Sequence, residues 1–176
     1  MIYKTNFKNL IILKKKSYKD KRGYFKELLL EKEIKQKFPF VVMSFSRKNV
    51  LRGLHIQNIN TQGKYISVIK GKVFDVVVDL RRKSETFGKT FSIILSEENN
   101  KSLYIPAGFA HAYYSYAEQN IIYYKLDNYY NPKFEDGIIA EDKDINIKWP
   151  NGKKLISKKD KDLKTFKEFK SSYKFL

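Results

Sequence analysis

Two histidines are the first candidates for proton chemistry, because the chain has no others. An imidazole titrates near neutral pH, so it can serve as a general base, a general acid or a metal ligand. His55 lies in the segment LRGLHIQ, and His111 lies in IPAGFAHAYYS, directly after a Pro-x-Gly turn. For either histidine alone, a hydrogen-bonded side chain inside β-structure is the simpler interpretation. The two settings together favour a site.

Each setting is similar to one half-motif of the cupins, a family of β jelly rolls. PAGFAH fits the second half-motif, Pro-x-Gly-x-x-His. In metal-binding cupins the first half-motif supplies a His-x-His pair, and here that place reads His55-Ile56-Gln57, with Ser115 where an Asn is common. A tight transition-metal site usually takes three or more good ligands. We therefore expect no metal and no other cofactor, which leaves His55 free to act as a base.

Longer stretches resemble the dTDP-4-dehydrorhamnose 3,5-epimerases, which are cupins. The resemblance runs in the family's order from about residue 20 to residue 160. It consists of RGYFKE, NVLRGLHIQ, QGK, GKVFDVVVDLR, SETFG, IPAGFAH, YK with NYYNP, and IKWP. The ordered sum of these motifs is specific, although no single one is. It implies an isomerase that inverts carbon centres beside the ketone of a nucleotide-linked 4-keto-6-deoxy sugar, in bacterial capsule or lipopolysaccharide synthesis.

The resemblance implies a general base with a partner. His55 matches the base that removes the proton alpha to the ketone, a task that suits an imidazole. Asp160, in SKKD, matches the carboxylate that orients and charges this base. Ser157-x-x-Asp160 is also a capping-box pattern for a tail helix, and both interpretations can hold together.

The resemblance also implies a cation and an acid. Lys64 matches the lysine that donates toward the C4 oxygen, where enolate charge develops, and an exposed strand lysine is the alternative. Tyr124, in IIYYKLDNYY, matches the acid that reprotonates the carbanion, and a core position is the alternative because the chain has 13 tyrosines. The base and the acid must lie on opposite faces of the sugar ring, since otherwise the proton returns with its original configuration.

Further residues resemble the family's substrate contacts. Arg22, Arg52 and Lys159 match the groups that hold the diphosphate, because guanidinium forks suit phosphate oxygens. Two aromatic side chains, Phe25 and Tyr130, could stack on the base or the sugar. The complete expected contact set is Arg22, Phe25, Glu27, Ser44, Arg52, Gln57, His111, Tyr130, Glu135 and Lys159.

The chain departs from the family where the nucleotide base is read. The family commonly has Gln-x-Asn-x-Ser before the catalytic strand, whereas this chain has Val42-Met43-Ser44-Phe45-Ser46. With the amide groups gone, the sequence leaves open dTDP or GDP as the carrier and a hexose or a heptose as the sugar. The alternative functions are a C3-only epimerase, a ketoisomerase of the same fold and a non-catalytic sugar-nucleotide-binding cupin.

The elements that must position these residues are mostly β-strands. From about Val41 to Leu126, short segments rich in Val, Ile, Tyr and Phe alternate with turn signals. This pattern predicts an all-β, cupin-type jelly-roll barrel, with one domain over residues 1–176. In KVFDVVVDL, Asp75 and Asp79 share a face, which is therefore either a polar interior or an exposed surface. Helix signals occur only near EKEIKQKF and in the C-terminal tail, SKKDKDLKTFKEFK, where Leu and Phe form one apolar stripe.

The formal net charge of +17 raises the possibility of a nucleic-acid partner. Residues 1–37 have 12 Lys or Arg against 4 Asp or Glu, and residues 151–176 have 9 against 3. Neither basic end carries a nucleic-acid motif. We therefore expect solvated lysines, no nucleic-acid partner, and a positive field that raises the encounter rate of an anionic sugar nucleotide.

The chain has no Cys, no signal-peptide pattern and no apolar run near the length of a membrane span. These features predict a cytoplasmic protein without disulfides, thiolate metal sites or membrane contact. The resemblance further implies a homodimer in which the amino-terminal strand and the RGYF segment reach into the partner's barrel.

Overall fold

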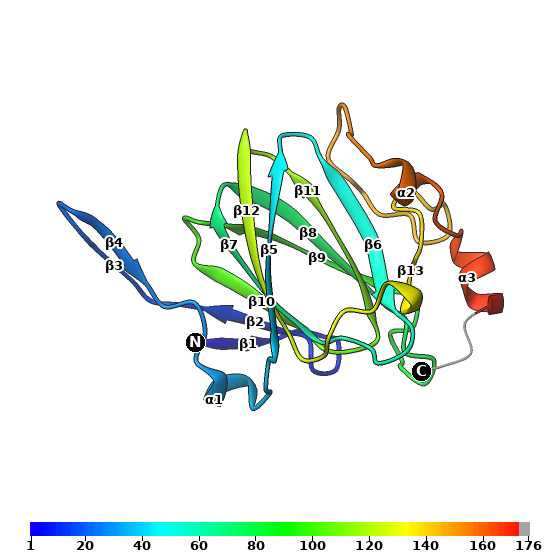
Figure 1. Ribbon diagram of the computed structural model, residues 1–176, viewed down its shortest axis with the longest axis horizontal. Helices are drawn as coiled ribbons and strands as arrows, with labels where there is room; N and C mark the ends of the chain where they lie inside the picture. The colour runs from blue at the N-terminus through cyan, green and yellow to red at the C-terminus, as the bar shows by residue number, and fades with distance from the viewer. Residues whose placement is uncertain (173–176) are drawn as a thin grey trace.

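Two large β-sheets face each other and make up most of the protein (Figure 1). The computed structural model describes residues 1–172, so the last four positions of the predicted domain, 173–176, lie outside the described residues. The first sheet has the strand order β1-β2-β10-β7-β12-β5. These strands are β1 (Ile2–Lys4), β2 (Ile11–Lys14), β10 (Lys101–Ile105), β7 (Lys64–Lys70), β12 (Gln119–Leu126) and β5 (Phe40–Arg47).

The second sheet has the order β13-β6-β11-β8-β9, and the strand pairs in both large sheets are antiparallel. Its strands are β13 (Glu135–Gly137), β6 (Leu51–Gln57), β11 (Phe109–Ser115), β8 (Lys72–Asp79) and β9 (Thr90–Ser96). The chain passes repeatedly from one sheet to the other, as between β7 and β8 or β11 and β12. This crossing pattern gives the predicted all-β jelly-roll barrel.

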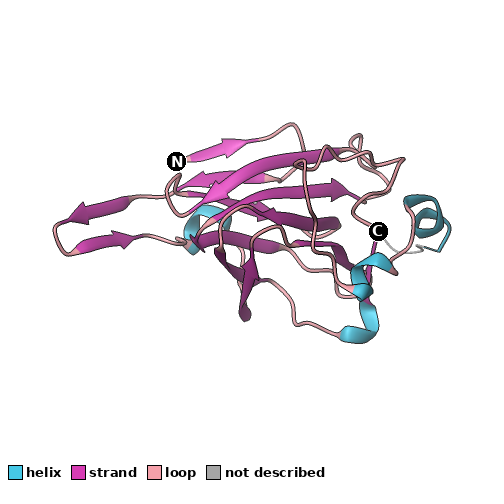
Figure 2. Ribbon diagram, turned by 90° about the horizontal axis from the view of Figure 1, so that it is seen from above, coloured by secondary structure: helices cyan, strands magenta, loops and turns pink. Residues whose placement is uncertain are grey.

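A two-stranded hairpin projects from the barrel on the side away from the C-terminal helices (Figure 1). It consists of β3 (Ser17–Asp20) and β4 (Gly23–Lys26). The helices are short and lie at the margins of the strand layers (Figure 2). They are α1 (Glu31–Ile34), the 3-10 helix η1 (Pro132–Phe134), α2 (Lys158–Lys161) and α3 (Phe166–Ser172). Within residues 1–172, every helix falls short of the length and apolarity needed to cross a bilayer.

The tail differs from the single apolar stripe that its sequence suggests. It folds as two helices, because α2 ends at Lys161 and α3 begins at Phe166. Thr165 and Glu168 start α3 with both halves of a capping box: the Thr165 hydroxyl accepts from the Glu168 N–H, and the Glu168 carboxylate accepts from the Thr165 N–H. A helix start at this position interrupts the tail just after Leu163.

The main core fills the space between the two sheets. It takes apolar side chains from β7, β8, β10, β11 and β12, including the fully buried Ile66, Val77 and Leu103. A second cluster lies on the outer face of the second sheet, where Phe166 and Phe169 of α3 pack against it. Each fully buried aromatic or branched side chain contributes about 1.5–3 kcal/mol. The tail is thus anchored by burial, which fixes the position of the neighbouring α2.

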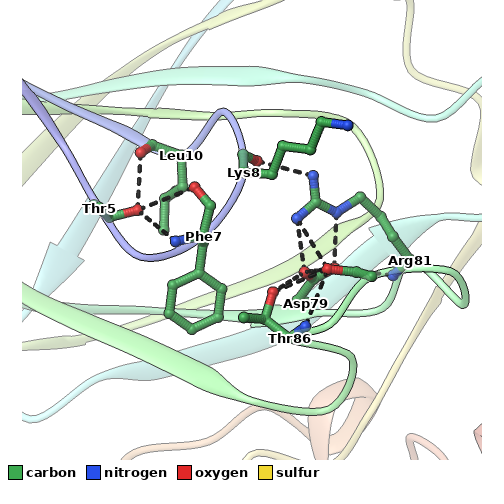
Figure 3. Close-up of polar contacts among 8 residues, drawn as sticks. Thr5, Phe7, Lys8, Leu10, Asp79, Arg81 and Thr86 are labelled. Carbon is green, nitrogen blue, oxygen red and sulfur yellow. Dashed lines mark hydrogen bonds and ion pairs between the residues drawn. The ribbon is translucent and has the colours of Figure 1, made fainter.

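Both carboxylates predicted on one face of β8 are fully buried, so this face is the polar interior alternative. Burial alone would raise the pKa of Asp79, but hydrogen bonds from Arg81, Ser84 and Thr86 outweigh it and hold the pKa below its usual value. The Arg81 guanidinium also donates to the Lys8 carbonyl oxygen at 2.9 Å (Figure 3). This network joins the end of β8 to the amino-terminal loop.

Candidate active site

A cavity of about 320 Å³ lies between the two sheets and contains most of the predicted chemical groups. Strands β5, β7 and β12 form its wall on the first sheet, and β6 and β11 form its wall on the second. The lining residues are Val42, Met43, Ser44, Arg52, His55, Lys64, His111, Tyr113, Tyr124, Leu126 and Tyr130.

The cavity adjoins a larger groove of about 770 Å³, and the two share Arg52, His55 and Tyr130 as lining residues. The other lining residues of the groove are Phe45, Ser46, Arg47, Val50, Leu51, Glu135, Leu155, Ile156, Ser157, Lys159 and Asp160. Cavity and groove together offer an elongated site with a smaller space at one end and a larger space at the other, a shape that suits a small reacting group attached to a larger carrier.

The two histidines lie directly opposite each other on neighbouring strands, because the register of β6 and β11 pairs His55 with His111. His55 Nε2 lies 2.8 Å from Asp160 Oδ1. A carboxylate can only accept a hydrogen bond, so Nε2 carries the proton and Nδ1 is the basic nitrogen. This arrangement fixes the tautomer of His55 and leaves one ring nitrogen able to take a proton.

Asp160 is held by several donors. Its second oxygen, Oδ2, accepts from the Gly53 N–H at 3.1 Å. Burial alone would raise the pKa of Asp160, but the hydrogen bonds from His55 and Gly53 outweigh burial, so the pKa lies below its usual value. The carboxylate of Asp160 therefore remains charged beside the imidazole at neutral pH.

Gly53 meets a steric requirement where β6 approaches β11. Its φ of +107° is in a region that L side chains rarely adopt, and a Cβ there would lie 2.4 Å from the His111 carbonyl oxygen. Only glycine fits this close approach. The same residue directs its N–H to Asp160, so one backbone constraint aligns the strand of the base with its carboxylate partner.

The pattern Ser157-x-x-Asp160 makes half of a capping box. Ser157 is the N-cap of α2, and its hydroxyl accepts from the Asp160 N–H at 3.0 Å. The Asp160 carboxylate, which would complete the box by returning to the cap, points instead to His55 and Gly53. The helix start and the pairing with histidine thus coexist, and the cap orients Asp160 toward the cavity.

Lys64 and Tyr124 reach the cavity from the first sheet. Burial lowers the pKa of Lys64 to about 8, and the charges of Glu135 and Asp75 partly offset this effect. Burial raises the pKa of Tyr124 well above its ordinary value, and electrostatic repulsion from Tyr113 and Asp75 raises it further. Tyr124 therefore keeps its phenolic proton at neutral pH, whereas Lys64 titrates near the physiological range.

His111 belongs to a second, deeper pair. Its Nε2 lies 2.8 Å from Oδ2 of the fully buried Asp75, and its ring centroid lies 6.3 Å from that of Tyr124. Tyr113, two residues farther along β11, also faces the cavity. The sequence prediction omitted Asp75 and Tyr113 from the site. The period-two alternation that places His111 inside also places Tyr113 there, but it does not show which side chains approach Tyr113 from other strands.

The open groove collects charged groups that the sequence assigned to substrate. Glu135 Oε2 accepts from the Lys159 ammonium at 2.6 Å and also from the Tyr130 hydroxyl. Arg52 lines both the groove and the cavity. Two cations, Arg52 and Lys159, therefore border one continuous space, which is an environment suited to phosphate oxygens.

Some expected contact residues lie elsewhere. The Gln57 amide donates to the Asn60 and Tyr129 carbonyl oxygens and accepts from the Asn131 N–H, so it anchors neighbouring loops. The remaining three lie on or directly after the projecting hairpin and line neither the cavity nor the groove of their own chain: Arg22, Phe25 and Glu27. Their contacts with substrate stay predictions.

The donor groups suit proton transfer better than metal binding. The first half-motif supplies one histidine, and the amide of Gln57 at its second ligand position is engaged by backbone groups. Across residues 1–172, no group of three or more His, Cys, Asp or Glu side chains is arranged to hold a metal ion. This donor set does not resemble the three- or four-ligand sites that transition metals prefer.

Known proteins match the chain along nearly its whole length. A sequence model of the dTDP-4-dehydrorhamnose 3,5-epimerase family matches residues 4–168. The enzyme of that name from Methanothermobacter thermautotrophicus is 39% identical over 173 residues, which cover 94% of each chain. The Legionella pneumophila epimerase in complex with dTDP-4-keto-L-rhamnose superimposes with a TM-score of 0.94, at 38% identity over 99% of this chain and 97% of that one.

A 3'-monoepimerase from Streptomyces bikiniensis, solved with dTDP-quinovose, has a TM-score of 0.90 at 26% identity over 96% of this chain and 89% of that one. The fold and the facing groups of the cavity define a cupin-fold epimerase, an isomerase of nucleotide-linked sugars. The chain belongs to the dTDP-4-dehydrorhamnose 3,5-epimerase family.

Proposed function

We propose that the protein epimerises a dTDP-linked 4-keto-6-deoxy sugar at C3 and C5. The observation that carries this proposal is the composition of one cavity. A histidine paired with a carboxylate comes from β6 of one sheet, and a protonated tyrosine comes from β12 of the facing sheet. Inversion at a carbon needs a base and an acid on opposite sides of the ring, and the two sheets supply one each.

In the proposed reaction, His55 Nδ1 removes the proton beside the C4 ketone, and Asp160 stabilises the imidazolium that forms. The electrons of the broken C–H bond move into the ketone and produce an enolate. Tyr124 then donates its phenolic proton to the opposite face of the same carbon, which inverts the centre. The same two steps at the second carbon complete the reaction.

Lys64 is proposed to stabilise the enolate oxygen. A cation fixed in a buried site stabilises developing negative charge more strongly than it would in water. Its lowered pKa also makes it a ready hydrogen-bond donor to that oxygen. Arg52 and Lys159 are proposed to bind the diphosphate. This contact would hold the reacting ring in the cavity while the nucleotide extends into the groove.

The nucleotide carrier has a second candidate. The β5 wall of the cavity presents Val42, which has no hydrogen-bonding group, and Ser44, whose hydroxyl already contacts Tyr113 and Tyr124. Neither offers an amide to a thymine. The carrier GDP, and with it a heptose as the sugar, therefore stays open as an alternative. A mismatch of one or two buried hydrogen bonds corresponds to about 1–3 kcal/mol.

A homodimer forms part of the proposal. The hairpin extends well beyond its own barrel, and its Tyr18, Tyr24 and Phe25 are all exposed. Exposed aromatic side chains on a projecting segment are favourable contacts for a second copy of the chain. In such a dimer, Arg22 and Phe25 would complete the partner's groove. The cytoplasmic location and the pathway of surface-polysaccharide synthesis expected from the sequence stay predictions.

Incubation with dTDP- and GDP-linked 4-keto-6-deoxy sugars in heavy water tests the proposal. We expect nuclear magnetic resonance to locate deuterium at both C3 and C5 of an inverted product. Deuterium and inversion at C3 alone would indicate a monoepimerase. A product in which the ketone has moved from C4 to C3, without inversion at C5, would indicate a ketoisomerase. Binding without deuterium incorporation from either carrier would contradict an epimerase and indicate a sugar-nucleotide-binding cupin.

A further inference from the structure

A row of four hydroxyl groups leads from Tyr124, the proposed acid, to the groove. The Tyr124 hydroxyl oxygen lies 3.3 Å from Ser44 Oγ. Ser44 Oγ lies 3.1 Å from the Tyr113 hydroxyl oxygen, and this oxygen lies 2.8 Å from Ser46 Oγ. At each contact either oxygen can be the donor, so the row can be hydrogen-bonded in either direction.

The two ends of the row lie in different spaces. Tyr124, Ser44 and Tyr113 line the cavity, whereas Ser46 lines the open groove. Ser44 and Ser46 are two residues apart on β5 and therefore share a face of that strand. Tyr113 reaches between them from β11 of the facing sheet. The row thus joins the cavity to the groove, and its Ser46 end is 4% exposed.

The proposed reaction requires that Tyr124 be reprotonated between the two inversions. After one inversion, Tyr124 has lost its proton and His55 has gained one, and a second inversion needs both groups reset. The phenolate is costly at this place, because burial raises the pKa of Tyr124 well above its ordinary value. A substrate that fills the cavity would separate Tyr124 from bulk water. A proton must then arrive through protein groups.

We propose that Ser46, Tyr113 and Ser44 relay protons from the groove to Tyr124 between successive inversions, an inference that rests on the proposed epimerase function. As the Tyr124 phenolate takes the Ser44 proton, Ser44 takes the proton of Tyr113, Tyr113 takes that of Ser46, and Ser46 takes one from water in the groove. The hydroxide left in the groove is neutralised by the proton that His55 releases. No net charge remains, and each oxygen ends with one proton.

Tyr113→Phe removes the central hydroxyl with little change in shape, and Tyr114→Phe is the matched control. Tyr114 is adjacent on β11, equally buried, and its hydroxyl donates to Asn49 Oδ1 at 2.7 Å, outside the cavity. Ser46→Ala breaks the outer end of the row without altering the cavity lining. Thermal unfolding of each variant measures whether it folds like the parent, and Ser46→Ala carries the test if Tyr113→Phe does not fold.

The measurement compares the first inversion, under rapid quench with enzyme in excess, with the later inversions and turnovers. The first inversion uses the proton already on Tyr124, so Tyr113→Phe and Ser46→Ala should slow it far less than they slow the later inversions. Every later step should be slowed, by up to roughly 10²-fold, and singly inverted sugar should be released. Tyr114→Phe should match the parent in both phases.

Two results would overturn the relay. Parental rates in both phases would show that the hydroxyls are not needed. An equal loss in the first and the later inversions would show that they only hold Tyr124 in place. If the parent protein itself converts no 4-keto sugar, the proposed function fails first, and the relay is withdrawn with it.

Discussion

At the scale of single residues, His55 and Lys64 share a cavity but are constrained in different ways. His55 is fixed by Asp160, so its tautomer is determined before substrate arrives. Lys64 is constrained by burial, which lowers its pKa to about 8. The orientation of His55 thus depends on a partner residue, whereas the charge of Lys64 depends on burial. Lys64 can therefore be tested by the pH dependence of the rate, and His55 by changes at Asp160 and at the helix that carries it.

The lowered pKa of Lys64 predicts an alkaline limit of activity. The protonated ammonium is the form that stabilises an enolate, so its contribution is present below pH 8 and is lost as pH rises through about 8. We expect kcat/KM of the parent to fall in that range. Lys64→Arg should lower the rate overall but remove the fall, because a guanidinium stays charged. Lys70→Arg, at the exposed end of the same strand, should keep the parental profile.

A pH profile in which the parent and Lys64→Arg are parallel above pH 8 would contradict the assigned role of Lys64. The contribution of Lys64 would then be independent of its charge. Its position beside the cavity would reflect packing of the strand alone.

The scarcity of metal ligands at the site predicts that activity survives exhaustive chelation. The second ligand position of the first half-motif holds Gln57, whose amide is engaged by backbone groups, and within residues 1–172 no group of three or more His, Cys, Asp or Glu side chains could hold a metal ion. Turnover should therefore be unchanged after treatment with a strong chelator and dialysis. Loss of turnover that one added divalent metal restores would refute the metal-free mechanism.

The site residues expected from distinctive motifs lie together, because His55, Lys64 and Tyr124 all line the cavity. Their catalytic roles stay predictions. Asp75 and Tyr113 were not included, because an Asp in an alternating strand and one tyrosine among 13 carry little local signal. Their importance depends on which side chains approach them from other strands. Such contacts follow from the register of β11 with its neighbours, which sequence patterns alone do not determine.

At the scale of elements, strands were predicted more accurately than helices. The segments KYISVIK and TFSIILS coincide with β7 and β9, and KVFDVVVDL contains β8. Alternating residues on a sheet are a local signal. The tail stripe was interrupted because Ser157 and Thr165 each begin a separate short helix. When one apolar pattern contains two possible N-cap residues, the sequence alone does not show at which of them a helix begins. That choice depends on the tertiary contacts of the tail.

The cap of α2 is predicted to affect both stability and catalysis. Ser157→Ala removes the acceptor of the Asp160 N–H and should lower the free energy of unfolding by about 0.5–2 kcal/mol. It should also lower kcat, because Asp160 is then less well oriented toward His55. Thr165→Ala removes the corresponding cap of α3 and should cost similar stability with unchanged kcat. Chemical denaturation and steady-state kinetics measure the two effects.

Equal kcat values for the two cap variants would show that the α2 cap does not position Asp160. A loss of kcat without a loss of stability in Ser157→Ala would instead show that Ser157 contacts the substrate directly.

At the scale of the whole molecule, the barrel and the hairpin divide the site. The barrel carries the proposed base, acid and enolate clamp, whereas the hairpin carries Arg22 and Phe25 away from them. The outer side of β5 is also exposed through Val41, Met43 and Phe45. An exposed apolar strand face beside an unattached arm fits a second copy of the chain. The proposed dimer would thus make each site from two chains.

Mixing two inactive variants tests this division. Arg22→Ala lacks a hairpin group, and His55→Ala lacks the base. In a mixed dimer, the hairpin of the His55→Ala chain can serve the intact barrel of the other chain, so part of the activity should return after the variants are unfolded and refolded together. Each variant refolded alone is the control. No recovery, in a mixture that sedimentation shows to contain dimers, would contradict sharing of the site.

The most direct test of the account separates removal of the proton from its delivery. Deuterium exchange and inversion are followed in heavy water for His55→Ala, Tyr124→Phe and the control Tyr123→Phe, with thermal stability measured alongside. His55→Ala should lose both processes, by about 10²–10⁴-fold. Tyr124→Phe should still form the enolate and regain deuterium from the base side, so exchange should outlast inversion, while Tyr123→Phe should match the parent. If Tyr124→Phe inverts both centres at the parental rate, the acid is another group and the two-sided mechanism is contradicted.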